Sequence, residues 1–351
     1  MTAEGFALKK QKAILDIIVM ASLLLLVLSL VVAFARRDSF NENDEDTAVG
    51  THQNDDSKKT FNLLIMGRDD AANLCDVIMV VSYDTKNHTV EVMQIPRDTY
   101  ASYTSSSYRK LNGAVHSLGG VSEFAEFLEK NLGIGIDFYA VTDLDTVAKA
   151  VDKIGGVRVS IEEDMCYNDP YQSLFIDLKA GEHILNGEQA NAFLRYRSGY
   201  VQGDIGRLDA QKIFIAALSK KLIFEVGMVD LVNIALLFLN DIETDLTPKD
   251  CIALIEGIKD IELENISFFT IPGESVQTPG GAWYYVINKE QTFDVIKTYF
   301  SPELSSEGFD SEELFTSEYQ KSFNEIYNAR GRYKVKRYSA NDICQNGIKI
   351  D

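Results

Sequence analysis

Three short apolar runs decide the fold: FNLLIM at residues 61–66, VIMVVSY at residues 77–83 and TVEVMQI at residues 89–95. Runs of this length that are rich in β-branched residues and bounded by turn residues are typical of buried strands. The sequence DTKNH at residues 84–88 consists of residue types that favour a turn, and Pro96 ends the third run. Because short connections favour antiparallel neighbours, the sequence predicts a three-stranded meander.

In such a meander, the end of the first strand, the start of the second and the end of the third share one edge. That edge collects charged residues: Asp69, Asp70, Asp76, Arg97 and Asp98. Asp69 and Asp76 could hold a divalent cation, because Mg²⁺ takes one or two carboxylates and completes its shell with phosphate oxygens. Ordinary turn and strand-cap aspartates are the alternative. With a cation present, Arg97 could help to clamp a pyrophosphate.

Helices and strands alternate after the meander. Apolar residues at helical spacing, several followed by glycine, predict helices at 111–118, 121–132, 143–154, 187–194, 205–224, 226–239, 248–258 and 292–300. Further strands are predicted at 137–141, 157–161, 266–271 and 283–287. This alternation indicates a layered α/β domain.

A cluster of arginines lies in the middle of a chain whose formal net charge is −19. Side chains two apart share a face only in an extended segment, so a helix must end near Leu194 if Arg195 and Arg197 serve one anion. Arg207 and Gln211 are four apart at the start of a helix, where exposed N–H groups favour phosphate. Surface arginines paired with acidic residues are the alternative.

The N-terminus predicts a membrane anchor. Residues 17–35 contain no charged side chain, and this run is long enough to cross a bilayer as a helix. Lysines at positions 9, 10 and 12 favour a cytoplasmic N-terminus. A cleavable signal peptide ending at residues 33–35 is the alternative, although its apolar region is usually shorter.

The predicted organisation has five parts. They are a cytoplasmic tail at 1–12, a transmembrane signal anchor at 13–35, a polar flexible linker at 36–60, an extracellular catalytic domain at 61–301 and a C-terminal tail of uncertain order at 302–351. The acidic composition argues against nucleic acid as a partner, since duplex binding needs a basic footprint. Four widely spaced cysteines, Cys75, Cys166, Cys251 and Cys344, argue against a metal cluster but allow one or two disulfides.

A run of motifs in one order resembles a known family. The motifs are NLLIMG at 62–67 with Asp69, DVIMV at 76–80, QIPRDT at 94–99, KLN at 110–112, GGV at 155–157, LNGEQA at 185–190, RYR at 195–197, and DIGR at 204–207 with Gln211. Together they resemble the LytR-CpsA-Psr (LCP) proteins, membrane-anchored enzymes of the bacterial envelope. The resemblance is strong over residues 61–224 and looser at PGE, residues 272–274.

The resemblance implies a layered α-β-α domain with a central mainly antiparallel or mixed sheet and a cavity for a polyprenyl chain. It implies transfer of a teichoic acid or capsular polysaccharide from a polyprenyl-pyrophosphate carrier to peptidoglycan, at the outer face of the cell membrane. By position, Asp69 and Asp76 would bind Mg²⁺ and act in catalysis with Arg97, Arg195 and Arg197. The implied substrate-binding residues are Lys110, Asp204, Arg207 and Gln211, with Arg207 joining the other arginines on the pyrophosphate.

The chain departs from the family pattern at two positions, where Ala71 and Leu74 stand in place of arginines. Arg68 could compensate in part, but we expect its side chain to leave from a different face. Two other functions stay open, and the missing arginines favour the second of them. One is a pyrophosphatase, in which water replaces the sugar acceptor. The other is a non-catalytic module that binds lipid-linked glycan and regulates wall assembly.

Overall fold

The computed structural model describes residues 60–69, 74–84, 86–103, 109–170, 174–200, 203–248, 260–278, 280–306, 309, 313–314 and 335–349. The predicted tail, anchor and linker before residue 60 lie outside these residues, as does nearly all of the predicted helix at 248–258. No helix within the described ranges combines the length and apolar character needed to cross a membrane.

The predicted meander is confirmed. Strands β1 (Thr60–Asp69), β2 (Leu74–Asp84) and β3 (Thr89–Gln94) pair antiparallel. They form the centre of a seven-stranded sheet with the order β13-β10-β3-β2-β1-β4-β9. Strands β4 (Phe138–Thr142) and β10 (Ile266–Thr270) run parallel to β1 and β3, whereas β9 (Glu243–Thr244) and β13 (Tyr338–Ser339) are antiparallel edges. The sheet is therefore mixed.

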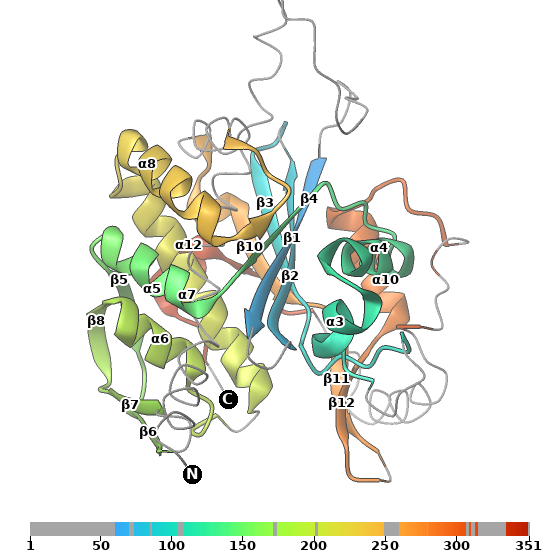
Figure 1. The fold of residues 1–351 in the computed structure, drawn as a ribbon, viewed down its shortest axis with the longest axis horizontal. Coiled ribbons are helices and arrows are strands. Elements are labelled where there is room, and N and C mark those ends of the chain that lie inside the picture. Colours follow the sequence, from blue (N-terminus) through green and yellow to red (C-terminus); the bar gives the residue numbers. More distant parts are fainter. Residues whose placement is uncertain are drawn as a thin grey trace, which may run out of the picture.

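Helices cover both faces of the sheet (Figure 1). Leu63, Ile65 and Val92 face a core closed by α5 (Leu144–Lys153), α6 (Gly187–Arg195), α7 (Asp204–Phe224), α8 (Met228–Phe238) and α12 (Ala340–Asn346). Leu64 and Val80 face a second core closed by α3 (Ala114–Leu118), α4 (Val121–Leu132) and α10 (Lys289–Tyr299). Burial on both faces explains the continuous apolar runs in the strands and confirms the three-layer architecture.

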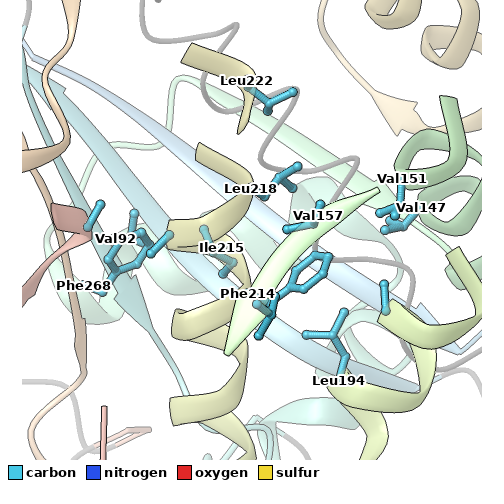
Figure 2. Packing of buried hydrophobic residues seen from close by; sticks show 14 of the residues in the cluster. Val92, Val147, Val151, Val157, Leu194, Phe214, Ile215, Leu218, Leu222 and Phe268 are labelled. Atoms are coloured by element: carbon cyan, nitrogen blue, oxygen red, sulfur yellow. The ribbon is translucent and has the colours of Figure 1, made fainter. Parts of the chain in front are cut away.

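Helix α7 is the central helix of the layer that packs on one face of the sheet. Figure 2 shows its side chains Phe214, Ile215 and Leu218 between the sheet, represented by Val92 and Phe268, and the outer elements. Since this helix is buried on most sides, its position relative to the sheet is strongly determined by packing. Its first residue, Asp204, and the residues one turn later therefore occupy a defined place beside the sheet.

Three hairpins complete the domain. They are β5 (Val157–Ile161) with β8 (Gly181–Leu185), β6 (Met165–Asp169) with β7 (Leu174–Leu178), and β11 (Gly273–Gln277) with β12 (Trp283–Ile287). Single 3₁₀ turns lie at Leu111–Gly113 (η2), Leu239–Asp241 (η3) and Leu263–Asn265 (η5). Hence the predicted helix at 111–118 starts as a 3₁₀ turn and becomes α-helical only after Gly113.

The described part of the C-terminal tail returns to the domain. Strand β13 pairs with β10, and α12 packs in the same core as α7. Arg337 forms a two-pronged ion pair with buried Glu91, in which its Nε lies 3.0 Å from Oε2. Residues 335–349 therefore complete one edge of the sheet. Among the described cysteines, Cys75, Cys166 and Cys344 form no disulfide.

Candidate functional site

A β-bulge presents Asp76 at the end of the sheet. In the pairing of β1 with β2, Gly67 faces Val77 and Arg68 faces Cys75, so Asp76 is the extra residue on β2. Such a bulge disrupts the ladder locally and re-aims a side chain. The Asp76 carboxylate reaches Arg97, whose Nη1 lies 2.5 Å from Oδ1. The structure thus brings together two residues that the predicted meander placed on one edge.

Arg97 links the sheet to helix α7. It follows β3 and Pro96 in a turn, and its Nη2 lies 3.5 Å from Oδ1 of Asp204. Burial opposes the charge of this guanidinium, but Asp204 and Asp76 outweigh burial and raise the pKa of Arg97 above its ordinary value. Arg97 is therefore a permanent cation held between two carboxylates.

The break predicted in the arginine stretch is present. Helix α6 ends at Arg195, and Tyr196 is extended, with φ −59° and ψ 131°. Helix α7 then begins at Asp204, after Gly203 with φ +55°, a conformation that favours glycine. The intervening segment brings Nη1 of Arg197 to 4.0 Å from Oδ1 of Asp204.

Asp204 is the centre of the cluster. Nη2 of Arg207 lies 3.0 Å from its Oδ1, so the oxygen that approaches Arg97 and Arg197 also pairs with Arg207. Burial alone would raise the pKa of Asp204, but Arg207, Arg97 and Arg197 together lower it. Burial lowers the pKa of Arg207, against the opposing effect of Asp204. We refer to Asp76, Arg97, Arg197, Asp204 and Arg207 as the arginine cluster.

Three buried polar atoms of the arginine cluster have no hydrogen-bond partner among the described residues: two donors and one acceptor, Oδ1 of Asp204. The Nε atoms of Arg97 and Arg207 are buried and lack a hydrogen-bond partner within the described part of the chain. Buried donors without partners are rare in native proteins, and a bound anion or water would satisfy them. The cluster also lies at the N-terminus of the 21-residue helix α7, whose partial positive charge favours an anion.

Lys110 extends this site through Asp98. Its Nζ lies 3.0 Å from Oδ2 of Asp98, while Nε of Arg97 lies 4.0 Å from the other oxygen of that carboxylate. The four cations, Lys110 and the three clustered arginines, face three carboxylates, those of Asp76, Asp98 and Asp204, which leaves one net positive charge. Sequence reasoning placed Asp98 on this edge but assigned it no role; its position directly after Arg97 was the available signal.

Two buried side-chain hydrogen bonds join α7 to the ends of β3 and β10, next to the arginine cluster. The amide Nε2 of Gln94 donates to Oε1 of Gln211 at 3.4 Å, so Gln211 supports the end of β3. Nζ of Lys212 lies 2.7 Å from Oδ1 of Asp209 and 2.9 Å from Oγ1 of Thr270 at the end of β10. Burial lowers the pKa of Lys212. Sequence reasoning missed Gln94 and Lys212; a lysine on the buried stripe of a predicted helix was the signal.

Other predicted site residues are placed less completely. The main chain of Asp69 ends β1 opposite Leu74, but its side chain and Ala71 lie outside the description. Arg195 is partly buried at the end of α6, and its role stays a prediction. Arg68 pairs with Glu243 of β9 at 2.7 Å, which agrees with a side chain that leaves from a different face.

Magnesium binding at this edge stays a prediction: the Asp76 carboxylate is an oxygen ligand of the right type, and it is paired with Arg97. Asp76 is an oxygen ligand from a strand end, and the main chain of Asp69 ends the adjacent strand. Mg²⁺ usually takes one or two protein carboxylates and fills its remaining positions with water and substrate phosphate oxygens. In the described ranges, no three acidic, histidine or cysteine side chains come together as a metal-binding group. An ion here would therefore depend on Asp69, Asp76 and its substrate.

Comparison with known proteins gives a consistent family. The model of the LytR_cpsA_psr family matches residues 28–300. The teichoic acid transferase TagV of Bacillus subtilis is 32% identical over 241 residues, which are 66% of this chain and 61% of TagV. The regulatory protein MsrR of Staphylococcus aureus is 30% identical over 253 residues, 68% of this chain and 74% of MsrR.

The folds agree as well. The crystal structure of B. subtilis TagV superposes with a TM-score of 0.58 at 28% identity, covering 69% of this chain and 97% of that one. The chain thus spans about three fifths of the full length of TagV but nearly all of its crystallised part. On the extent of these matches, the chain belongs to the LytR-CpsA-Psr family.

Proposed function

We propose that this protein transfers a glycopolymer of the teichoic acid or capsular type from a polyprenyl-pyrophosphate carrier to peptidoglycan. The observation that carries the proposal is the arginine cluster, in which Arg97, Arg197 and Arg207 converge on Asp204 beside Asp76. The relative TagV is named a polyisoprenyl-teichoic acid–peptidoglycan teichoic acid transferase, which supports the same substrate class. An anchor at residues 13–35 would keep the domain at the outer face of the membrane, where a carrier whose lipid chain lies in the membrane presents its pyrophosphate.

The arginines would bind the pyrophosphate of the donor. Each guanidinium can donate two hydrogen bonds in a planar fork that matches phosphate oxygens. Arg197 is the most exposed of the three, with 47% of its side chain accessible, whereas Arg207 has 5%. We infer that Arg197 meets the donor first and that Arg207 fixes the geometry of the buried side. Asp69 and Asp76 would hold Mg²⁺, which when bound supplies further positive charge against the pyrophosphate oxygens.

The reaction is a phosphoryl transfer. A sugar hydroxyl of the wall attacks the phosphorus that carries the glycopolymer, and a new phosphodiester P–O bond forms. The P–O bond to the polyprenyl phosphate breaks, so polyprenyl phosphate leaves with the bonding electrons, and the hydroxyl proton passes to a carboxylate of the site or to water. The fixed guanidinium groups stabilise the charge on the leaving phosphate without having to reorganise, and the burial of Arg207 strengthens this effect.

A non-catalytic role is the second candidate. Leu74 stands opposite the end of β1, where relatives are expected to carry an arginine, and Asp76 is already paired with Arg97. Both features lower the positive charge available at the mouth of the site. The relative MsrR is named a regulatory protein, which is compatible with binding without turnover.

One assay separates the candidates. The full-length protein in nanodiscs is incubated with polyprenyl-pyrophosphate glycan, Mg²⁺ and peptidoglycan. Polymer attached to the wall supports the transferase; release of the glycan phosphate to water alone indicates a pyrophosphatase; binding without turnover indicates the regulatory module.

Variants of single arginines test the site. Arg97→Ala is expected to reduce transfer by about a hundredfold, the effect of losing one transition-state contact. Arg197→Ala is expected to reduce it by about tenfold, because Arg197 is more exposed and its charge is more screened by water. Arg158→Ala is the matched control, because Arg158 is an exposed arginine on β5 outside the cluster. Full transfer by Arg97→Ala would remove the cluster from the mechanism.

A further inference from the structure

The hairpin β11–β12 forms a second border of the site. Main-chain hydrogen bonds join it to the segment that follows Arg97: the N–H of Tyr285 donates to the carbonyl of Asp98, and the N–H of Tyr100 donates to the carbonyl of Tyr285, both at 2.9 Å. Tyr285 also pairs in parallel with Thr99. In Figure 1 the hairpin projects at the end of the molecule where β1 ends.

One aromatic side chain of β12 lies next to the charged residues, and a second lies on the opposite face of the hairpin. The ring of Tyr284 lies 5.8 Å from Nζ of Lys110, which is itself paired with Asp98. Trp283 is on the other face of the strand, and 53% of it is exposed. Thr99 and Tyr285 pair in parallel, so the two segments run in the same direction. Going back along β12 from Tyr285 to Trp283 therefore follows the main chain that leads back from Thr99 to Arg97.

The two strands of the hairpin are regularly paired as far as Gln277 and Trp283. Five residue pairs are in register, and Trp283 lies directly opposite Gln277 on the same face. At the tip, the N–H of Thr278 donates to the carbonyl of Ala282 at 2.8 Å, and the N–H of Gly281 donates to the carbonyl of Thr278 at 2.9 Å. Nε2 of Gln277 donates to the carbonyl of Gly281 at 3.3 Å, so the hairpin itself holds this amide beside the exposed indole and leaves Oε1 as an acceptor.

We propose that this outer face, with Trp283 and Gln277 at its centre, binds the sugar rings of the acceptor glycan strand. The inference rests on the proposed transferase function and names its acceptor site. The C–H face of a sugar ring packs well on an indole, while ring hydroxyls can exchange hydrogen bonds with a side-chain amide. The half-exposed indole of Trp283 suits the uncharged rings of a sugar chain.

The acceptor, rather than the donor, is the substrate that the face around Trp283 would bind. The donor carries a pyrophosphate, so the arginine cluster can hold it by charge. The sugar hydroxyl of the wall carries no charge, and the arginines give it no comparable attraction. Recognition of the sugar rings therefore relies on packing and neutral hydrogen bonds, and the hairpin joined to Asp98 offers both.

The test uses the fact that Trp283 is the single tryptophan of the chain. The full-length protein in nanodiscs is titrated with soluble glycan strands released from peptidoglycan, and its emission is recorded. We expect the emission to shift with strands. In a pelleting assay with insoluble peptidoglycan and no donor, Trp283→Ala should weaken binding about tenfold, the loss expected for an aromatic anchor, while Trp283→Phe keeps most of it.

Phe175→Ala is the matched control, because Phe175 is an exposed aromatic residue on the β6–β7 hairpin. In the transfer assay, Trp283→Ala should raise the KM for peptidoglycan about tenfold and leave the KM for the donor unchanged. Equal pelleting by wild type and Trp283→Ala would overturn the inference, as would an emission shift with donor but none with strands. If pelleting depends on Trp283 while the wild type transfers nothing, the transferase proposal fails and the glycan site stands.

Discussion

The two borders of the site solve different problems of recognition. On the α6–α7 side, Arg207 and Asp204 are largely buried, and every charge is paired with another. On the hairpin side, Trp283 is neutral and half-exposed. Burial of charge is costly unless the groups are paired, so the first border is rigid and its members depend on one another. Within the second border, the exposed Trp283 contributes contact area that the core does not need.

The strongest test of this contrast is Arg207→Ala. Removal of this guanidinium leaves Asp204 buried with weaker partners, which should lower the free energy of unfolding by about 3–5 kcal/mol. Arg197→Ala removes a half-exposed arginine from the same carboxylate and should cost less than about 1 kcal/mol. Urea unfolding of both variants gives the comparison.

Transfer assays complete this pair. Both variants should lose transfer, since both arginines face the donor pyrophosphate in the proposed site. Equal stability losses for the two substitutions would show that burial does not distinguish them. In that case the arginine cluster would be an ordinary surface network rather than a mutually dependent buried one.

A second test uses pH. Because the arginines lower the pKa of Asp204, its ionised form stabilises the folded state above the pKa of an unfolded aspartate, near 3.8. That contribution is lost as the pH falls through the lower folded pKa. Asp204→Asn should therefore cost about 2–3 kcal/mol at neutral pH, and the difference from wild type should shrink below pH 3.8. A difference that stays constant down to acid would assign the loss to shape rather than charge.

The fold could be predicted in large part because its signals are local. The runs at 61–66, 77–83 and 89–95 became β1, β2 and β3, and the glycines after residues 118 and 132 end α3 and α4 as expected. The edge strands could not be predicted. Strands β9 and β13 are two residues long, so they form only because the sheet offers an open edge.

That the residues of the arginine cluster lie near one another could be predicted in part, but their pairing could not. The end of α6 and the start of α7 followed from helical spacing, so the approach of Arg197 to Arg207 was foreseeable. That Asp204 pairs with Arg97, more than a hundred residues earlier, depends on how α7 packs on the sheet, which no local pattern contains. The bulge that presents Asp76 is likewise a property of the β1–β2 register.

A third test perturbs the hairpin border without removing an aromatic side chain. A Cβ at Gly273 would lie 2.5 Å from the carbonyl oxygen of Val286 and 2.6 Å from the ring of Tyr285. Gly273→Ala should therefore displace β12 and cost about 1–3 kcal/mol, measured by thermal or urea unfolding. Gly280→Ala is the control at the tip, where the nearest atom would be 3.9 Å away. A neutral Gly273→Ala would show that the base of the hairpin is adaptable.

The smallest effect is expected from Trp283→Ala on stability. An exposed side chain that the core does not need should change the free energy of unfolding by less than about 0.5 kcal/mol, although the same substitution is expected to weaken glycan binding tenfold. In Arg207→Ala, by contrast, stability and donor binding should fall together, because that guanidinium both binds the donor in the proposed site and pairs with Asp204. A substantial loss of stability in Trp283→Ala would mean that the indole is part of the fold. The neutral border would then resemble the charged one, and loss of glycan binding by the variant could no longer be assigned to a direct contact.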